Sequence, residues 1–177
     1  IALLSQCMEY FKEENDLAYI KSIHAITLCY TQVERYDLSS HFSTFGIRLA
    51  NEYEIAEMIP YFKNAEGINH TKQKDYQAAI KLLKETEPEF EKSEDYASLI
   101  TTQFFLGKCY WEINDKKNAI AYLPKAHEGI QTQKYSRAAF REGYDLLNEY
   151  NGEVNEKAKE FFNIKKLLLL DKANNQH

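Results

Sequence analysis

The sequence predicts an all-α fold, a right-handed superhelical stack of about four helical hairpins that follows one N-terminal helix. Its 177 residues include only 3 prolines and 6 glycines, too few to punctuate a many-stranded sandwich or barrel. Apolar residues make up 44% of the chain, which is enough for a packed core. A residue pattern also recurs every 40 positions, and repeats of this length indicate stacked helical units.

The repeat is clearest around Gly107, which Tyr110 follows three residues later. Later positions of the same unit are Ala119, Leu123 and Ala126. Forty residues earlier, the matching positions hold Gly67, Ala79 and Leu83. Small residues let two helices approach closely, and large ones fill the space between them. The register of the repeat is Tyr30, His70, Tyr110 and Tyr150. In this register His70 is interpreted as a packed core residue.

The helices follow from this register. An N-terminal helix is expected at 2–13. The first helices of the hairpins are expected at 17–34, 60–72, 95–113 and 136–150. The second helices are expected at 37–51, 75–91, 116–131 and 153–171. Pro60 falls at a helix start, where proline is tolerated, whereas Pro88 and Pro124 predict a kink or an early end inside second helices. Residues 1–177 are therefore interpreted as one repeat domain with units of roughly 17–51, 60–91, 95–131 and 136–171.

Two stretches carry a family resemblance, KDYQAAIKLLKETEPEFEKSEDYASLITTQFFLGKCYWEINDKKNAIAYL and REGYDLLNEYNGEVNEKAKEFFNIKKLLLLD. In the unit that begins in the first stretch, the order Leu106-Gly107, Tyr110, Ala119, Leu123 and Ala126 is similar to the tetratricopeptide repeat (TPR). Residues 61–171 resemble the TPR sensor region of helix-turn-helix transcriptional regulators of the Bacteroidetes. A looser resemblance is to the peptide-pheromone receptors of Gram-positive bacteria. The resemblance implies a signalling role through protein or peptide binding, although this chain shows no helix-turn-helix domain of its own.

The net charge and the hydropathy of the chain limit the classes of partner that it is expected to bind. The net charge of −5 opposes phosphate contacts, so direct nucleic-acid binding by this segment is not expected. The longest apolar run, 167–170, is far shorter than the roughly 20 residues of a membrane span, so no membrane contact is expected. A cytoplasmic location is expected, with the periplasm as the alternative if the chain is the sensor part of a membrane-linked regulator. The chain begins at Ile1, so missing targeting signals prove little.

The sequence contains no motif typical of a catalytic, metal-binding or phosphate-binding site. Its five histidines are scattered, and neither an H-E-x-x-H nor a C-x-x-C motif occurs. The scattered cysteines Cys7, Cys29 and Cys109 are interpreted as small apolar residues in a reducing compartment. No G-x-S-x-G elbow and no glycine-rich phosphate loop is present. We therefore expect no enzyme activity, no metal site and no cofactor.

A ligand groove is expected along the first helices of the stack. Its candidate residues are Lys21, His24, Tyr61, Asn64, Thr71, Lys72, Lys108, Trp111, Arg141, Tyr144 and Asn148. Amide side chains could pair with a peptide backbone, cationic ones with acidic groups, and aromatic ones could form anchor pockets. The alternative for Trp111 and Phe104 is packing between hairpins, and for the polar residues it is an ordinary hydrated helix face.

The function expected from these features is a protein- or peptide-binding scaffold, the sensor or interaction region of a regulatory protein. The alternative is a structural module that forms a homodimer through its C-terminal helix. Leu167–Leu170 motivates that alternative, because four successive leucines leave no polar side on the helix.

Overall fold

The computed structural model describes residues 2–132 of the chain. The chain divides into two compact units, residues 1–93 and 94–177, and each is described by itself. Their boundary falls between the expected repeat units 60–91 and 95–131, so it separates whole hairpins. The expected helices at 136–150 and 153–171 lie outside the described residues.

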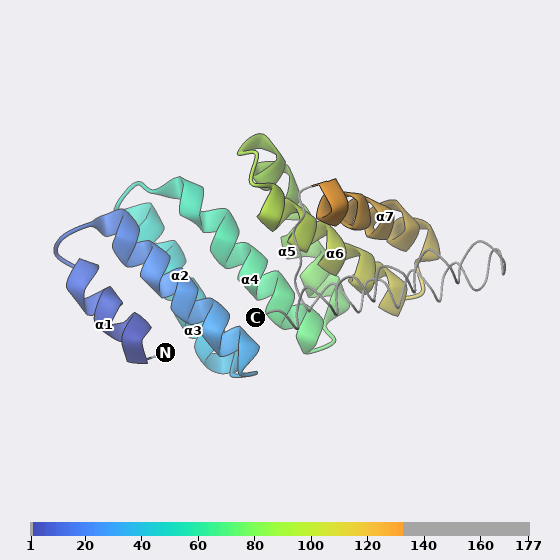
Figure 1. The fold of residues 1–177 in the computed structure, drawn as a ribbon. Helices are drawn as coiled ribbons and strands as arrows, with labels where there is room; N and C mark the ends of the chain where they lie inside the picture. Colours follow the sequence, from blue (N-terminus) through green and yellow to red (C-terminus); the bar gives the residue numbers. More distant parts are fainter. Residues whose placement is uncertain (1, 133–177) are drawn as a thin grey trace, which may run out of the picture. The chain divides into compact units, whose positions relative to one another are not determined.

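The first unit consists of helices that lie side by side in chain order (Figure 1). Its elements are α1 (Ala2–Phe11), α2 (Asp16–Gln32), α3 (Tyr36–Glu52), the short 3-10 helix η1 (Ala56–Met58), α4 (Ile59–Lys72) and α5 (Tyr76–Lys92). Helix α1 packs on α2, α2 pairs with α3, and α4 pairs with α5; α4 also contacts both α2 and α3.

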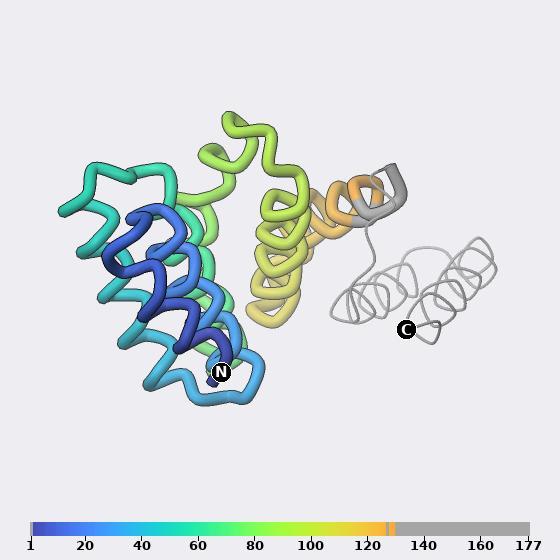
Figure 2. Tube along the Cα trace, turned by 60° about the vertical axis from the view of Figure 1, so that its left-hand side comes forward, coloured from blue at the N-terminus to red at the C-terminus, as the bar shows by residue number. Residues whose placement is uncertain are grey.

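The described part of the second unit is one hairpin of α6 (Tyr96–Glu112) and α7 (Lys116–Thr132). Figure 2 shows these two helices, in yellow and orange, lying side by side. Residues 2–132 contain no strand. The predicted all-α stack of helical hairpins is therefore confirmed, and every described helix begins and ends within two residues of its expected bounds.

The connections repeat every 20 residues. Each successive pair of helices from α2 to α7 is separated by a residue with left-handed backbone, at Glu34, Glu54, Lys74, Glu94 and Asn114, with φ between 57° and 65°. In the first of these turns, the amide of Arg35 donates to the carbonyl of Tyr30 at 2.9 Å, and the amide of Glu34 donates to the carbonyl of Thr31 at 3.3 Å. This Schellman arrangement closes a helix and reverses the chain within three residues.

Polar side chains begin four of the helices. Asp75, Asp95 and Asp115 accept hydrogen bonds from backbone amides three residues later, and Asn15 does the same for α2. Such caps satisfy amide groups that have no partner within the helix. Together with the left-handed residues of the turns, these caps account for the short, regular connections between helices.

Two prolines lie inside helices that continue past them. Pro60 sits in the first turn of α4, as expected. The early ends that Pro88 and Pro124 predict are wrong, because α5 runs on to Lys92 and α7 to Thr132. In α5, Leu83 and Phe90 are fully buried on either side of Pro88. Burial of such side chains stabilises the helix by an amount similar to the roughly 3 kcal/mol that an internal proline costs.

The 40-residue register appears as repeated side-chain contacts. A Cβ atom added to Gly67 would lie 2.8 Å from Leu83, and one added to Gly107 would lie 2.7 Å from Leu123. Each glycine thus lets the two helices of its hairpin approach closely. The tyrosine positions also repeat their contacts, since Tyr30 stacks on Phe42 at 5.6 Å and Tyr110 stacks on Tyr122 at 5.7 Å.

His70, which occupies the tyrosine position of the middle hairpin, is not a core residue. Its side chain is 33% exposed, and its Nδ1 lies 3.2 Å from Oδ2 of Asp75. The position equivalent to Phe42 and Tyr122 is Leu82 in this hairpin, so no second ring is present there to cover the imidazole. His70 instead contacts the turn that joins α4 to α5.

A buried polar network joins α2, α3 and α4. The hydroxyl of Thr31 donates to Oδ1 of Asn69 at 2.7 Å, and Nδ2 of Asn69 donates to the hydroxyl of Ser39 at 2.9 Å. The two hydroxyls lie 2.9 Å apart, so the three side chains can form a closed ring of hydrogen bonds. All three are buried. Because a buried polar group needs its partners, this ring fixes how α4 sits against the first hairpin.

Candidate functional site

The expected binding face includes residues of α2 and α4 that meet within the first unit. The ring of His24 on α2 contacts the ring of Tyr61 on α4 edge to face, with their centroids 5.6 Å apart. Lys21 and Lys72, which belong to the same expected face, are exposed. Candidate residues from two successive first helices therefore lie next to each other, as the 40-residue register requires.

His24 supplies a neutral imidazole to this face. Its ring also contacts the ring of Phe62, at 5.4 Å. Burial among these groups lowers the pKa of His24 to about 4, against a weaker opposing effect from its hydrogen bond to the backbone of Tyr61. At neutral pH the side chain is therefore an uncharged aromatic group that can still form hydrogen bonds.

Asn64 and Thr71 lie inside the packing of the second hairpin. Nδ2 of Asn64 donates to the hydroxyl of Thr86 on α5 at 3.3 Å, and the hydroxyl of Thr71 donates to the carbonyl of Gly67 at 2.9 Å. Both side chains are buried. The hydrogen bond of Asn64 joins α4 to α5, and that of Thr71 stays within α4, so the exposed part of the face consists of other residues.

The candidates on α6 belong to the second unit. Lys108 and Trp111 are half-buried, and Nζ of Lys116 lies 5.7 Å from the centre of the Trp111 ring. Phe104, in contrast, is buried and contacts Phe105 edge to face, which agrees with its alternative role in packing. The remaining candidates, Arg141, Tyr144 and Asn148, lie outside the described residues.

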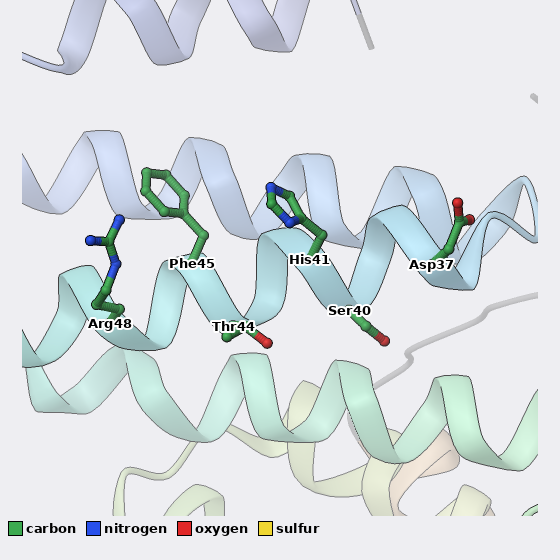
Figure 3. Close-up of a pocket in the computed structure, with 6 residues that line it drawn as sticks. All are labelled: Asp37, Ser40, His41, Thr44, Phe45 and Arg48. Carbon is green, nitrogen blue, oxygen red and sulfur yellow. The ribbon is translucent and has the colours of Figure 1, made fainter.

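A shallow hollow of about 460 Å³ runs along one face of α3. Its lining residues, which Figure 3 shows, are Asp37, Ser40, His41, Thr44, Phe45 and Arg48. The guanidinium of Arg48 lies 5.2 Å from the centre of the Phe45 ring. The sequence did not predict this hollow, because the expected groove was placed on the first helix of each hairpin and α3 is a second helix. The residues that line the hollow nevertheless recur at helical spacing on one face of α3.

The charges at the two ends of this hollow are far apart. Asp37 pairs with Arg35 at 3.0 Å, and this hydrogen bond lowers the pKa of the Asp37 carboxyl. Arg48 lies eleven residues further along the helix, or roughly 16 Å at the helical rise. Between them, the hydroxyl of Ser40 donates to Oε2 of Glu66 on α4 at 2.9 Å. The hollow is therefore an open surface feature whose charged ends one small molecule would not bridge.

Residues 2–132 contain no group of three His, Cys, Asp or Glu side chains that could hold a metal ion. Cys7, Cys29 and Cys109 form no disulfide bond with any described residue, and of the three only Cys109 is fully buried. None of the described helices is long and apolar enough to cross a membrane.

These observations define an all-α protein of the helical-repeat class. Neither a protein-family model nor a curated protein matches the chain. Among solved structures, it is similar to the crystal structure of BtubC (BKLC) from P. vanneervenii. The two are 14% identical with a TM-score of 0.73, over 99% of this chain and 73% of that one. At this identity the similarity concerns the fold alone.

Proposed function

We propose that the chain is a TPR-type scaffold that binds a peptide or partner protein through the exposed face of its first helices. In this role it serves as the sensor or interaction region of a regulatory protein. The observation that carries the proposal is the contact between His24 and Tyr61, because it joins equivalent faces of two successive first helices into one surface. Repeated helices that present one continuous face are suited to extended ligands.

The chemistry of the face favours an acidic peptide with an apolar or aromatic anchor. Lys21 offers an exposed ammonium group three residues from His24 on α2, and Lys72 offers another at the far end of α4, eleven residues or roughly 16 Å beyond Tyr61. His24 adds no charge at neutral pH. Ammonium groups attract carboxylates, and aromatic side chains at the centre of an interface contribute most of the binding free energy. The proposed ligand therefore combines carboxylates with one large apolar side chain.

A peptide-display selection on the full chain tests the proposal. We expect acidic peptides to be enriched, and to bind less tightly as salt increases, because surface charges are screened. Fluorescence anisotropy should show an affinity at least about tenfold weaker for Lys21→Glu/Lys72→Glu than for the wild type. Lys81→Glu/Lys84→Glu, a double charge reversal at two exposed positions of α5, is the matched control and should leave the affinity within about twofold.

The proposal is wrong if no selected peptide gives saturable binding. It is also wrong if the double charge reversal and the control weaken binding equally, because only the net charge would then matter. Binding that Tyr61→Ala weakens, while the fold measured by circular dichroism is unchanged, would identify the anchor of the ligand.

A further inference from the structure

Helices α2 and α4 run parallel beneath the proposed binding face, in one fixed alignment. The ring of His24 contacts the ring of Tyr61 at 5.6 Å, and further along the hydroxyl of Thr31 donates to Oδ1 of Asn69 at 2.7 Å. The two partners differ by 37 positions in the first contact and by 38 in the second. Figure 1 shows the two helices running in the same direction. A residue of α2 therefore lies level with the residue of α4 that follows it by about 37 positions.

Two lysines lie at opposite ends of this face. The alignment places Lys21 level with Met58, one residue before α4 begins, whereas Lys72 is the last residue of α4. Fourteen residues separate these two levels, or roughly 20 Å at the helical rise. Lys72 follows Tyr61 by eleven residues, close to three turns, so it leaves α4 on the same side. Both lysines are exposed, and neither has a carboxylate partner among residues 2–132.

An exposed leucine lies midway between the two lysines. Leu28 follows Lys21 by seven residues, close to two turns, so both side chains leave α2 on one side. The same spacing places Leu28 roughly 10 Å from Lys21 along the helix axis and roughly 10 Å from the level of Lys72. Leu28 is 37% exposed, whereas the equivalent Ile68 on α4 is 9% exposed. The face therefore presents a cation, an apolar side chain and a second cation in line.

The stacking of the repeat leaves this face uncovered. Helix α2 packs on α1, α3 and α4, and α4 packs on α2, α3 and α5. Each of the two helices thus has packed neighbours both before and after it in the chain. Lys21, Leu28 and Lys72 are exposed with all these neighbours in place.

We propose that the ligand of this face is an extended peptide segment with two carboxylates about six residues apart and a large apolar side chain midway between them. This inference rests on the proposed function and specifies its ligand. An extended chain advances roughly 3.3 Å per residue, so six residues span the roughly 20 Å between the lysines, and three residues reach Leu28. One carboxylate pairs with Lys21, the other pairs with Lys72, and the apolar side chain lies on Leu28.

An extended segment fits the polar groups of the face better than a helical one. The amide of Gln32 is exposed at the end of α2, and His24 is neutral at neutral pH, so both can form hydrogen bonds with main-chain groups. Main-chain groups are accessible in an extended peptide, whereas a helix pairs them internally. A helical ligand would also need about fourteen residues to span the same distance.

Two peptides of identical composition test the spacing. The probe has seven residues and blocked termini, with a glutamate at each end, a phenylalanine in the centre and serines between them. It is too short to form a stable helix. The control peptide carries its two glutamates directly beside the phenylalanine, roughly 7 Å apart. Fluorescence anisotropy on the full chain, with the same dye on both peptides, should show at least about threefold weaker binding of the control peptide, because its carboxylates do not reach both lysines.

Charge-removing variants locate each carboxylate. Lys21→Gln or Lys72→Gln is combined with the exchange of glutamate for glutamine at either end of the probe. Each lysine should couple to one end by at least about threefold, and the two lysines should couple to opposite ends. Lys84→Gln, at an exposed position of α5, is the control and should couple to neither end.

The central contact has a cycle of its own. Leu28→Ser should weaken binding of the probe at least about threefold, because apolar surface of the phenylalanine then stays in water. It should leave unchanged the binding of a peptide whose phenylalanine is replaced by serine. Val33→Ser, at an apolar residue that is 57% exposed just past the end of α2, is the matched control. Circular dichroism checks that each variant retains the fold.

Failure of this inference can be told apart from failure of the proposed function. Equal binding of the probe and the control peptide would overturn the spacing, and so would coupling of both lysines to the same end of the probe. The spacing is also wrong if the probe does not bind although a display-selected peptide binds and Lys21→Glu/Lys72→Glu weakens it. The absence of saturable binding of any acidic peptide would overturn both proposals.

Discussion

The hairpins α2–α3 and α4–α5 follow the same 40-residue register, but equivalent buried positions hold polar residues in α2–α3 and apolar residues in α4–α5. At the positions where α4–α5 holds Gly67 and Leu83, α2–α3 holds Thr27 and Ser43. All four residues are buried. The hydroxyl of Thr27 donates to the carbonyl of Ile23 at 3.0 Å, and that of Ser43 donates to the carbonyl of Phe62 on α4 at 3.0 Å.

The difference shows that a repeat position specifies burial and total size rather than polarity. In α2–α3 the two positions hold two side chains of moderate size, Thr27 and Ser43. In α4–α5 they hold one large side chain, Leu83, and Gly67, which has none. Polar residues at such positions are tolerated because every hydroxyl finds an acceptor. Those acceptors lie on specific helices, so the polar hairpin also fixes its neighbour, whereas apolar packing is less directional.

The largest expected effect comes from making the apolar hairpin polar. Leu83→Ser should lower the free energy of unfolding by about 4 kcal/mol, because it leaves a cavity beside Gly67 and buries a hydroxyl. Urea unfolding followed by circular dichroism measures the change. Lys84→Ser, one residue further along and exposed, should cost less than about 0.5 kcal/mol. Equal losses for the two variants would contradict the burial difference between these positions.

A smaller loss is expected from breaking the polar ring. Asn69→Ala should lower the free energy of unfolding by about 3 kcal/mol, since Thr31 and Ser39 lose an amide partner in a buried site. Asn51→Ala is the control, because this asparagine is exposed and bonds only to its own helix, at the carbonyl of Ile47.

The triple variant Thr31→Val/Ser39→Ala/Asn69→Leu sharpens the same comparison. It replaces all partners by apolar groups, so it should recover most of the stability that Asn69→Ala loses. Ser39→Ala introduces the residue that Ala79 and Ala119 already provide at this position. A triple variant that is less stable than Asn69→Ala would show that the ring adds to the free energy of unfolding beyond providing hydrogen-bond partners for its own three side chains.

The smallest effect concerns the pH dependence of the junction between the two hairpins. The pKa of His24 is about 4 in the folded chain and about 6.5 in the unfolded chain, so the unfolded state binds a proton first as the pH falls. Stability should therefore decrease between pH 6.5 and pH 4, by about 2 kcal/mol from this half-buried group. His24→Phe, which introduces the residue that α6 carries at the equivalent Phe104, should flatten this dependence in urea unfolding across that range.

His41→Phe is the matched control for His24, because His41 is exposed on α3. It should leave the slope of stability against pH as it is in the wild type. If His24→Phe and the wild type lose stability in parallel from pH 6.5 to pH 4, other groups cause the acid sensitivity.

Helix bounds followed from the sequence because local chemistry sets them. Asp75, Asp95 and Asp115 each cap the helix that follows them, an interaction within three residues of chain. The 40-residue pattern of small and large residues identified which helices form a hairpin. The left-handed turn residues could not be predicted, because Glu34, Glu54 and Glu94 are unusual where glycine is preferred. Their conformation is imposed by the helices that each turn connects.

The candidate site was less predictable than the fold. The register placed both His24 and Tyr61 on the expected binding face, and the structure brings their rings into contact. The same register placed Asn64 and Thr71 on the binding face, yet both are buried. Helical periodicity gives the direction in which a side chain leaves its helix, but its exposure depends on how closely the next helix approaches.

The sequence by itself determined the all-α class, the positions of the helices and the 40-residue repeat, because capping, turn residues and spacing act over short stretches of chain. Only the tertiary structure decided that Pro88 and Pro124 cause no early end of their helices, that His70 lies at the edge of its hairpin, and that Thr31, Ser39 and Asn69 form one ring. These outcomes depend on contacts between residues distant in sequence, and burial, charge and hydrogen bonding are properties of those contacts.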